Sequence, residues 1–130
     1  MNQDRKHILI ADDEERILSS LSMALENIGY DVSTASSGSE AMEKLLGCIE
    51  GSRPVDLLIS DIQMAGMNGL ELLDKINDSG LEIPVMVITG FGDKGMVVEL
   101  MRKGCADYID KPLEPVSFTN RVQAVLNSSS

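Results

Sequence analysis

Five short apolar runs alternate with stretches of helical periodicity along this chain, and each run has the length of one buried strand. The expected strands cover about residues 6–11, 31–35, 55–60, 85–89 and 108–110. The expected helices cover about residues 14–28, 37–46, 69–78 and 93–103, with a fifth that carries Phe118, Val122 and Val125. This repeated order predicts an α/β fold in which helices cover both faces of a five-stranded parallel sheet.

Several boundaries carry recognisable stop and start signals. Gly29 and Gly104 follow two of the helical stretches and are suited to ending them. Ser37 and Glu40 have the spacing of a capping box, with Ser37 as N-cap and Glu40 reaching back to it. The run at 31–35 alternates between apolar and polar residues, so we expect it at an edge of the sheet.

The length and composition fit one soluble domain. The chain has 130 residues, of which 43% are hydrophobic and 25% charged, enough for a single core. We expect the core to span about 6–126, and the pattern-free residues 127–130 to begin a linker or a disordered tail. No apolar run approaches the roughly 20 residues of a membrane span. The polar start lacks the apolar core of a secretory signal, which predicts a cytoplasmic protein without membrane contact.

Charge and cysteine usage exclude further classes. The formal net charge of -10 argues against direct nucleic-acid binding, which requires basic surface. Cys48 and Cys105 have neither C-x-x-C spacing nor nearby histidines, so neither a zinc site nor a redox motif is indicated. We expect both to be reduced, partly buried thiols.

Polar residues suited to phosphoryl chemistry follow four of the expected strands. They are Asp12 and Asp13 after the first, Asp61 after the third, Thr89 after the fourth and Lys111 after the fifth. Ligand sites of open α/β sheets lie at the carboxyl ends of the strands. If the strands are parallel neighbours, three carboxylates, a hydroxyl and an ammonium therefore converge there.

Carboxylates gathered at one edge would repel each other unless a cation neutralises them. Mg²⁺ is the expected counter-charge for Asp12, Asp13 and Asp61, because it binds few protein oxygens and shares its shell with phosphates. Other interpretations remain open: an aspartate after a strand can be a helix N-cap, Thr89 a β-branched strand end, and Lys111 a solvated surface lysine. A cis Lys111-Pro112 bond would turn Lys111 back toward the strand ends.

These motifs together resemble the response-regulator receiver domain of bacterial two-component signalling, of the chemotaxis-receiver type. The resemblance covers about residues 6–126. The matching motifs are Ile10-Ala11-Asp12-Asp13-Glu14, Ser60-Asp61-Ile62-Gln63-Met64 with Asn68-Gly69 behind it, Val87-Ile88-Thr89-Gly90 and Tyr108-Ile109-Asp110-Lys111-Pro112. It implies a flavodoxin-like fold with strand order 2-1-3-4-5.

The resemblance also implies a role for each site residue. Asp61 would be the phosphoacceptor, with Asp13 and Asp61 ligating Mg²⁺ directly and Asp12 acting mainly through water. Gln63 would lend its backbone carbonyl to the metal. The remaining roles are a switch hydroxyl, a switch aromatic and a phosphoryl-binding lysine, which fall on Thr89, Tyr108 and Lys111. The family usually has proline where this chain has Ala65, which removes a rigid φ from the phosphoacceptor loop.

The implied function is transfer of a phosphoryl group to Asp61 from a sensor histidine kinase or histidine phosphotransfer protein. Such a protein catalyses only its own phosphorylation and dephosphorylation, and it controls an output domain or a target protein. Charge added at Asp61 would draw in Thr89 and let Tyr108 move. Residues 89–93 resemble receivers attached to transcriptional output domains.

The stretch 93–103 indicates where that signal would emerge. Five of six consecutive residues from 96 to 101 are apolar, so they cannot all face the core, unless the helix is buried all round. We expect Met96 or Val98 to be exposed. An exposed apolar patch is suited to a partner or to a homodimer formed through the fourth helix, fifth strand and fifth helix.

Three other functions compete for the same residues. A haloacid-dehalogenase-type phosphohydrolase has its D-x-D motif after the first strand, whereas here the acids are adjacent and the proposed acceptor follows the third strand. A flavin-binding flavodoxin-like protein would need a phosphate-cradling loop rich in Ser, Thr and Gly after the first strand, and none follows it in this sequence. A degenerate receiver that acts as a phosphorylation-independent interaction module is the remaining alternative, and the complete acid set with Thr89 and Lys111 argues against it.

Overall fold

The structure is a computed structural model that describes residues 5–47, 54–90 and 93–128. Strands and helices alternate within these ranges, which confirms the predicted α/β class. The elements are β1 (His7–Ala11), α1 (Glu15–Asn27), β2 (Asp31–Ala35), α2 (Gly38–Leu46), β3 (Leu57–Asp61), α3 (Gly69–Ser79), β4 (Val85–Thr89), α4 (Lys94–Arg102), β5 (Asp107–Asp110) and α5 (Pro115–Ser128).

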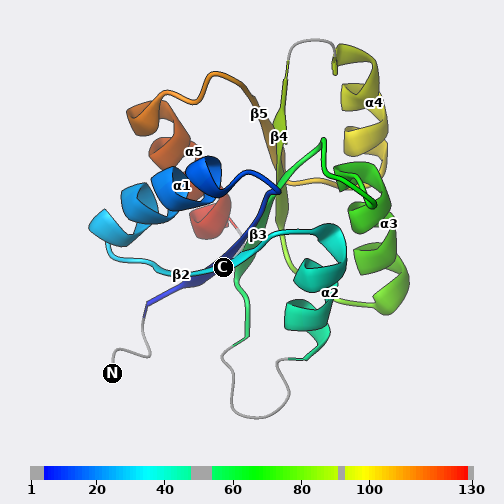
Figure 1. Ribbon diagram of the computed structural model, residues 1–130, viewed down its shortest axis with the longest axis horizontal. Coiled ribbons are helices and arrows are strands. Elements are labelled where there is room, and N and C mark those ends of the chain that lie inside the picture. Colours follow the sequence, from blue (N-terminus) through cyan, green and yellow to red (C-terminus); the bar gives the residue numbers. More distant parts are fainter. Residues whose placement is uncertain (1–4, 48–53, 91–92, 129–130) are drawn as a thin grey trace.

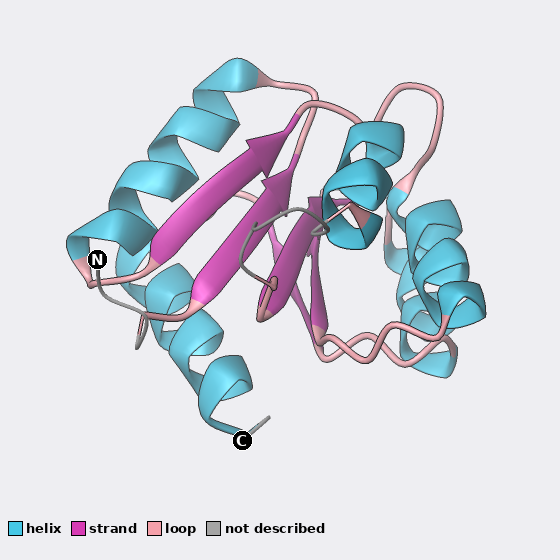
Figure 2. Cartoon of the chain, turned by 90° about the horizontal axis from the view of Figure 1, so that it is seen from below, coloured by secondary structure: helices cyan, strands magenta, loops and turns pink. Residues whose placement is uncertain are grey.

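The strands form one parallel sheet in the order β2-β1-β3-β4-β5, as predicted (Figure 1). Helices α1 and α5 cover one face, and α2, α3 and α4 cover the other (Figures 1 and 2). Along β1, Ile8 and Ile10 pack toward α1 and α5, while Leu9 and Ala11 pack toward α2 and α3. The central strands are continuously apolar because both of their faces are buried. The more polar β2 lies at the edge, as expected.

The register of the sheet aligns the carboxyl ends of four strands. Ala11 lies opposite Ser60, Asp61 opposite Ile88, and Thr89 opposite Asp110. In a parallel sheet the side chains that follow these positions emerge at one edge. The fold therefore gathers the polar residues that follow the strands into one row.

Helix α3 begins in direct contact with the end of β3, and a glycine makes this contact possible. The Gly69 amide donates to the Ile62 carbonyl at 2.9 Å. A Cβ at position 69 would lie 2.9 Å from the Ile62 Cα and 3.1 Å from the Asp61 carbonyl oxygen. Both atoms belong to the backbone and cannot turn aside, so only glycine fits this approach.

The predicted capping box at α2 is half right. The Ser37 side chain accepts a hydrogen bond from the Glu40 amide at 3.0 Å, as predicted. The Glu40 carboxylate, however, accepts from the Ser36 amide at 2.6 Å and also from the Ser36 hydroxyl, one residue before the predicted partner. These two bonds hold the pKa of Glu40 below its ordinary value. A reciprocal capping box is present instead at the start of α3, between Asn68 and Glu71.

The described part of the predicted tail is helical. Helix α5 continues through Asn127 to Ser128, and the Ser128 hydroxyl donates to the Val125 carbonyl at 3.1 Å. Val125 and Leu126 are buried, so their packing extends the helix past the last apolar residue. Residues 127 and 128 therefore continue α5, so a linker or tail that begins at 127 would start inside this helix, and 129–130 lie outside the described residues.

Cys105 is a half-buried free thiol, as expected. Burial, with a smaller contribution from the charge of Asp107, raises the pKa of this thiol above its ordinary value. Cys48 lies outside the described residues. In the three described ranges, no helix is long and apolar enough to cross a lipid bilayer.

Candidate functional site

Four of the predicted site residues meet at the carboxyl edge of the sheet. Asp61 is the last residue of β3 and Asp12 follows β1, which is the neighbouring strand. Thr89 ends β4, the strand on the other side of β3, and Lys111 follows β5. Asp12, Asp61 and Thr89 are buried, whereas a third of the Lys111 side chain is exposed. The sheet order thus brings together residues up to 99 positions apart in the chain.

The two carboxylate oxygens of Asp61 have different partners. Oδ2 accepts from the Lys111 ammonium at 2.8 Å, and Oδ1 accepts from the backbone amide of Gln63 at 3.0 Å. The Lys111 amide also donates to the Thr89 carbonyl at 2.8 Å, which ties the end of β5 to the end of β4. The Lys111-Pro112 bond is cis, as predicted. Asp61 is therefore held in a fixed orientation against a cation.

Lys111 has a strongly negative environment. Its partial burial lowers the pKa of the ammonium, but the hydrogen bond and the charge of Asp61 outweigh this, and Asp12 and Glu14 add to the effect. The net result is a pKa above the ordinary value of a lysine. Lys111 is therefore fully charged at neutral pH, and its ammonium is paired with Asp61.

Asp12 is the least well satisfied group of the site. Its Oδ1 accepts from the Glu14 amide at 2.9 Å, while its fully buried Oδ2 has no hydrogen-bond partner. The pKa of Asp12 is raised from 3.8 to about 6, mainly by burial and also by the nearby charge of Asp61, while the bond from Glu14 lowers it. The N-cap of α1 is Glu14, so the alternative that Asp12 or Asp13 merely caps this helix is wrong.

Asp13 lies apart from the two buried carboxylates. It is exposed, and its Oδ2 accepts from the Ala65 amide at 3.1 Å, which connects the end of β1 to the loop after β3. Among the described residues, no three His, Cys, Asp or Glu side chains are grouped so that they could hold a metal ion as they stand. The predicted acids are all at this edge, but Asp13 is bonded to the Ala65 amide, while Lys111 pairs with Asp61 as expected.

The residues nevertheless fit a magnesium ion by their chemistry. Hard divalent ions prefer carboxylate and carbonyl oxygens, which Asp12, Asp13, Asp61 and the backbone of Gln63 supply. The unpaired Oδ2 of Asp12 is a buried acceptor that lacks a partner, and a cation would provide one. The donor set and this orphaned oxygen agree with the predicted metal.

Asp93 is a residue of the site that sequence reasoning missed. Its buried carboxylate accepts from the Gln63 side-chain amide at 2.9 Å and from the Gly90 amide at 2.7 Å. It therefore links the loop after β3 to the loop after β4. Gln63 and Asp93 are 30 residues apart, so no local pattern predicts this contact.

Asp110 is a second missed residue. The Thr89 hydroxyl donates to Asp110 Oδ1 at 2.6 Å and makes a longer contact of 3.4 Å with the Ile109 carbonyl. Thr89 is thus turned toward β5 rather than toward Asp61. Tyr108, on the same strand as Asp110, is half-buried. The hydroxyl and the aromatic predicted to act together lie on adjacent strands.

Comparison with known proteins assigns this arrangement to one family. Residues 8–123 match the response regulator receiver domain. The chain is 36% identical over 124 residues to the alkaline phosphatase synthesis transcriptional regulatory protein PhoP of Bacillus subtilis, covering 95% of this chain and 50% of that protein. It is 38% identical over 114 residues to the transcriptional regulatory protein FixJ of Rhizobium meliloti, covering 88% and 53%. The chain therefore spans about half the length of these relatives.

Solved structures give the same result. The receiver domain protein from Clostridium thermocellum superposes with a TM-score of 0.86 at 27% identity, covering 95% of this chain and 96% of the other. FixJ-N superposes with a TM-score of 0.84 at 31% identity, and a CheY-like receiver from Methanospirillum hungatei with 0.85 at 29%. Each of these two covers 96% of both chains. The flavodoxin-like fold predicted from the sequence is confirmed.

Proposed function

The chain belongs to the response regulator receiver family, and on that premise we propose that Asp61 accepts a phosphoryl group from a sensor histidine kinase or a histidine phosphotransfer protein. Receiver domains are signalling domains of two-component regulators rather than classical enzymes. One observation supports the proposal most: the buried Asp61 carboxylate is paired with Lys111 at 2.8 Å beside a second buried carboxylate, Asp12. Charged groups held in this way are typical of functional sites.

The chemistry would be an in-line displacement at phosphorus. An Asp61 oxygen forms the new P–O bond while the bond from phosphorus to the donor nitrogen breaks, and the electron pair stays on the departing imidazole. The Gln63 amide holds Oδ1 of Asp61 in place at 3.0 Å. Lys111, released from Oδ2, would then balance the charge of the phosphoryl oxygens.

The metal would be held by Asp12, Asp13, Asp61 and the backbone carbonyl of Gln63. When bound, Mg²⁺ supplies positive charge against the phosphoryl oxygens. Asp13 would have to leave the Ala65 amide to take part, since one of its oxygens is bonded there. Asp12 would gain a partner for its unpaired Oδ2.

The switch would start from the hydrogen bond between Thr89 and Asp110. In the described structure the Thr89 hydroxyl donates to Asp110 at 2.6 Å. A phosphoryl group on Asp61 would add about -1.5 to -2 charge, and its oxygens would compete for the Thr89 proton. Thr89 would turn away from β5, and Tyr108 would fill the space that it leaves.

The surface that changes would be formed by α4, β5 and α5. Val98 and Met101 on α4 are 57% and 64% exposed, whereas Leu100 is buried and Met96 half-buried. The expectation that some of these apolar residues are exposed is confirmed. We propose that residues 1–130 form a single receiver domain and that this surface contacts an output domain, a target protein or a second copy of the chain.

The test is intact-mass analysis after incubation with acetyl phosphate and Mg²⁺. We expect one phosphoryl adduct on the wild type, none on Asp61→Ala, and none in EDTA. Asp78→Ala is the matched control, because Asp78 is an exposed aspartate on α3 and its variant should label like the wild type.

Two results would reject the proposal. Labelling of Asp61→Ala would place the phosphoryl group on another residue. No labelling of the wild type, together with no Mg²⁺ binding by calorimetry, would favour the degenerate receiver that works as an interaction module. In that case the exposed residues of α4 would become the first place to look for function.

A further inference from the structure

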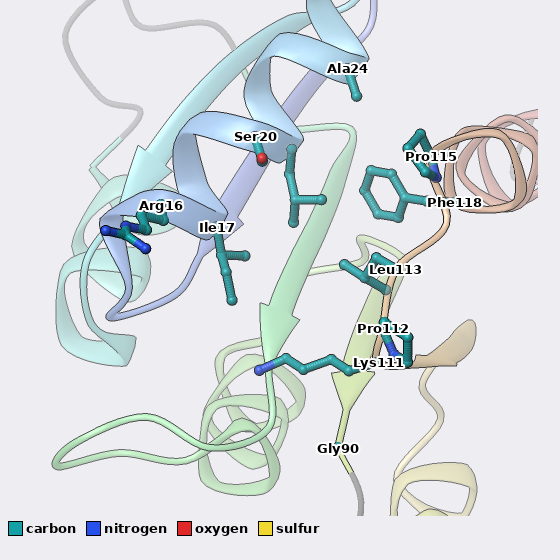
Figure 3. Close-up of a pocket in the computed structure, with 11 residues that line it drawn as sticks. Arg16, Ile17, Ser20, Ala24, Gly90, Lys111, Pro112, Leu113, Pro115 and Phe118 are labelled. Carbon is teal, nitrogen blue, oxygen red and sulfur yellow. The ribbon is translucent and has the colours of Figure 1, made fainter.

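A groove of about 630 Å³ lies between α1 and the segment that joins β5 to α5 (Figure 3). Small-molecule sites in proteins usually have about 300–1,000 Å³. The lining is mainly apolar, with Leu21 and Ala24 on the α1 side and Leu113 and Phe118 on the other. A groove of this size and lining is suited to the apolar body of a small organic molecule.

The polar part of the lining is cationic. Arg16 and Lys111 belong to the groove, and in Figure 3 their nitrogen atoms lie toward the left of it, with Phe118 and Pro115 toward the right. Arg16 is solvent-exposed, and the ion pairs found within the described ranges do not include it. Lys111 is paired with Asp61. Arg16 is therefore the lining cation that has no carboxylate partner among the ion pairs of the described residues.

The net charge of -10 does not prevent an anion from binding here. At physiological ionic strength the Debye length is about 8 Å, so distant acidic residues are largely screened. Asp61, Asp12 and Glu14 act on Lys111 at close range, but the charged residues that line the groove itself are the cations Arg16 and Lys111. A neutral apolar ligand would gain nothing from Arg16, and a cationic ligand would be repelled by it. The charge of the lining therefore favours an anion.

We propose that this groove binds a small amphiphilic organic anion, such as an aromatic carboxylate. The acid group would lie toward the end of the groove that Arg16 and Lys111 line, and the ring would pack on the half-buried Ala24 and Leu113. Charge-assisted hydrogen bonds to the guanidinium would fix the orientation of the acid group. The site is separate from the phosphoacceptor, but it shares Lys111 with Asp61.

The first test uses the unphosphorylated protein and 2-naphthoate, with neutral 2-naphthamide as the matched ligand. In a titration followed by ¹⁵N NMR, we expect the amide signals of Ser20, Ala24 and Leu113 to shift and to saturate. A ligand of this size should have a Kd of about 1 mM. The neutral amide should bind about ten-fold more weakly, because it lacks the charged contact.

Variants locate the site. Arg16→Gln should weaken naphthoate binding by about ten-fold and leave naphthamide unchanged. Lys75→Gln, which removes the same charge from the exposed surface of α3, should change neither. Ala24→Leu should reduce binding of both ligands by filling the groove. Equal affinity for acid and amide, unsaturated shifts spread over the surface, or equal effects of Arg16→Gln and Lys75→Gln would overturn the proposal.

Lys111 lines the groove and also contacts Asp61, so ligand binding in the groove should affect phosphorylation of Asp61. This coupling rests on the proposed function. An anion in the groove would compete with Asp61 for Lys111, so saturating 2-naphthoate should slow acetyl phosphate labelling by about two- to ten-fold. Arg16→Gln should remove most of this inhibition. An unchanged rate with bound naphthoate would refute the coupling and leave the binding site intact. Absence of labelling without naphthoate would refute the proposed function, and the titration would still decide the site.

Discussion

The polar groups at the two edges of the sheet differ in how they are paired. At the amino edge, His7 Nε2 lies 2.7 Å from the Ser33 hydroxyl, and the His7 amide donates to Asp56 Oδ2 at 2.8 Å. At the carboxyl edge, Asp12 and Asp61 are both buried, and one oxygen of Asp12 has no partner. The first edge pairs the polar groups named here, whereas the second buries two carboxylates side by side, of which Asp61 is paired with Lys111 and Asp12 keeps an unpaired oxygen.

This difference indicates which edge is optimised for stability. A buried acceptor without a partner costs free energy, and two neighbouring carboxylates cost more. Natural proteins retain such costs mainly where function requires them. The carboxyl edge therefore has the properties of a functional site, and the amino edge has those of a structural contact.

The largest effect should come from the tight backbone contact at the carboxyl edge. A Cβ on Gly69 would lie 2.9 Å from the Ile62 Cα, so Gly69→Ala should lower the free energy of unfolding by about 2–3 kcal/mol. Gly95→Ala is the control, because nothing lies within 4 Å of a Cβ at that position of α4. That change should raise the free energy of unfolding by about 0.5–1 kcal/mol. Urea unfolding measures both, and equal effects would show that the contact is easily relieved.

Isosteric substitutions at the two edges should change the free energy of unfolding in opposite directions. Asp12→Asn keeps an acceptor for the Glu14 amide and removes a buried charge, so it should stabilise the protein in EDTA by about 2 kcal/mol at pH 7.5. Asp56→Asn weakens the charge-assisted bond from the His7 amide and should destabilise it by about 1 kcal/mol. Destabilisation by both substitutions would break the comparison between the edges.

The pH dependence of stability should carry the signature of Asp12. Its pKa in the folded protein is raised from 3.8 to about 6, so the folded state binds this proton more tightly than the unfolded state. The associated stability is present below the unfolded pKa and is lost as the pH rises through about 6. Between about pH 5 and pH 7.5 the wild type should lose about 1 kcal/mol relative to Asp12→Asn in EDTA. A constant difference between the two unfolding curves would contradict the raised pKa.

The fold was predictable because its signals are local and repeated. Apolar runs and helical periods predicted a five-stranded α/β fold, and the resemblance to receivers supplied the strand order. The polar residues after four of the strands indicated which edge would hold the site. The contacts of Asp93 and Asp110 were not predictable, because their partners Gln63 and Thr89 reach them only through the folded sheet. The contact of Asp13 with the Ala65 amide was not predictable for the same reason. Sequence patterns place residues at an edge, whereas side-chain partners depend on the packed loops.

The smallest effect should come from a part of the carboxyl edge that is well satisfied. The 2.6 Å bond from the Thr89 hydroxyl to Asp110 holds that hydroxyl away from Asp61. Asp110→Asn keeps an acceptor but removes its charge, so it should lower the free energy of unfolding by only about 0.5 kcal/mol.

Because the resting bond is weaker, Thr89 should turn away from β5 more often. In ¹⁵N NMR of the unphosphorylated variant, the signals of Thr89 and α4 should move part of the way toward their positions after acetyl phosphate treatment. Asp78→Asn should leave them in place. If Asp110→Asn leaves them in place as well, the bond to Asp110 does not hold the switch, and the carboxyl edge is organised by Asp61 and Lys111 alone.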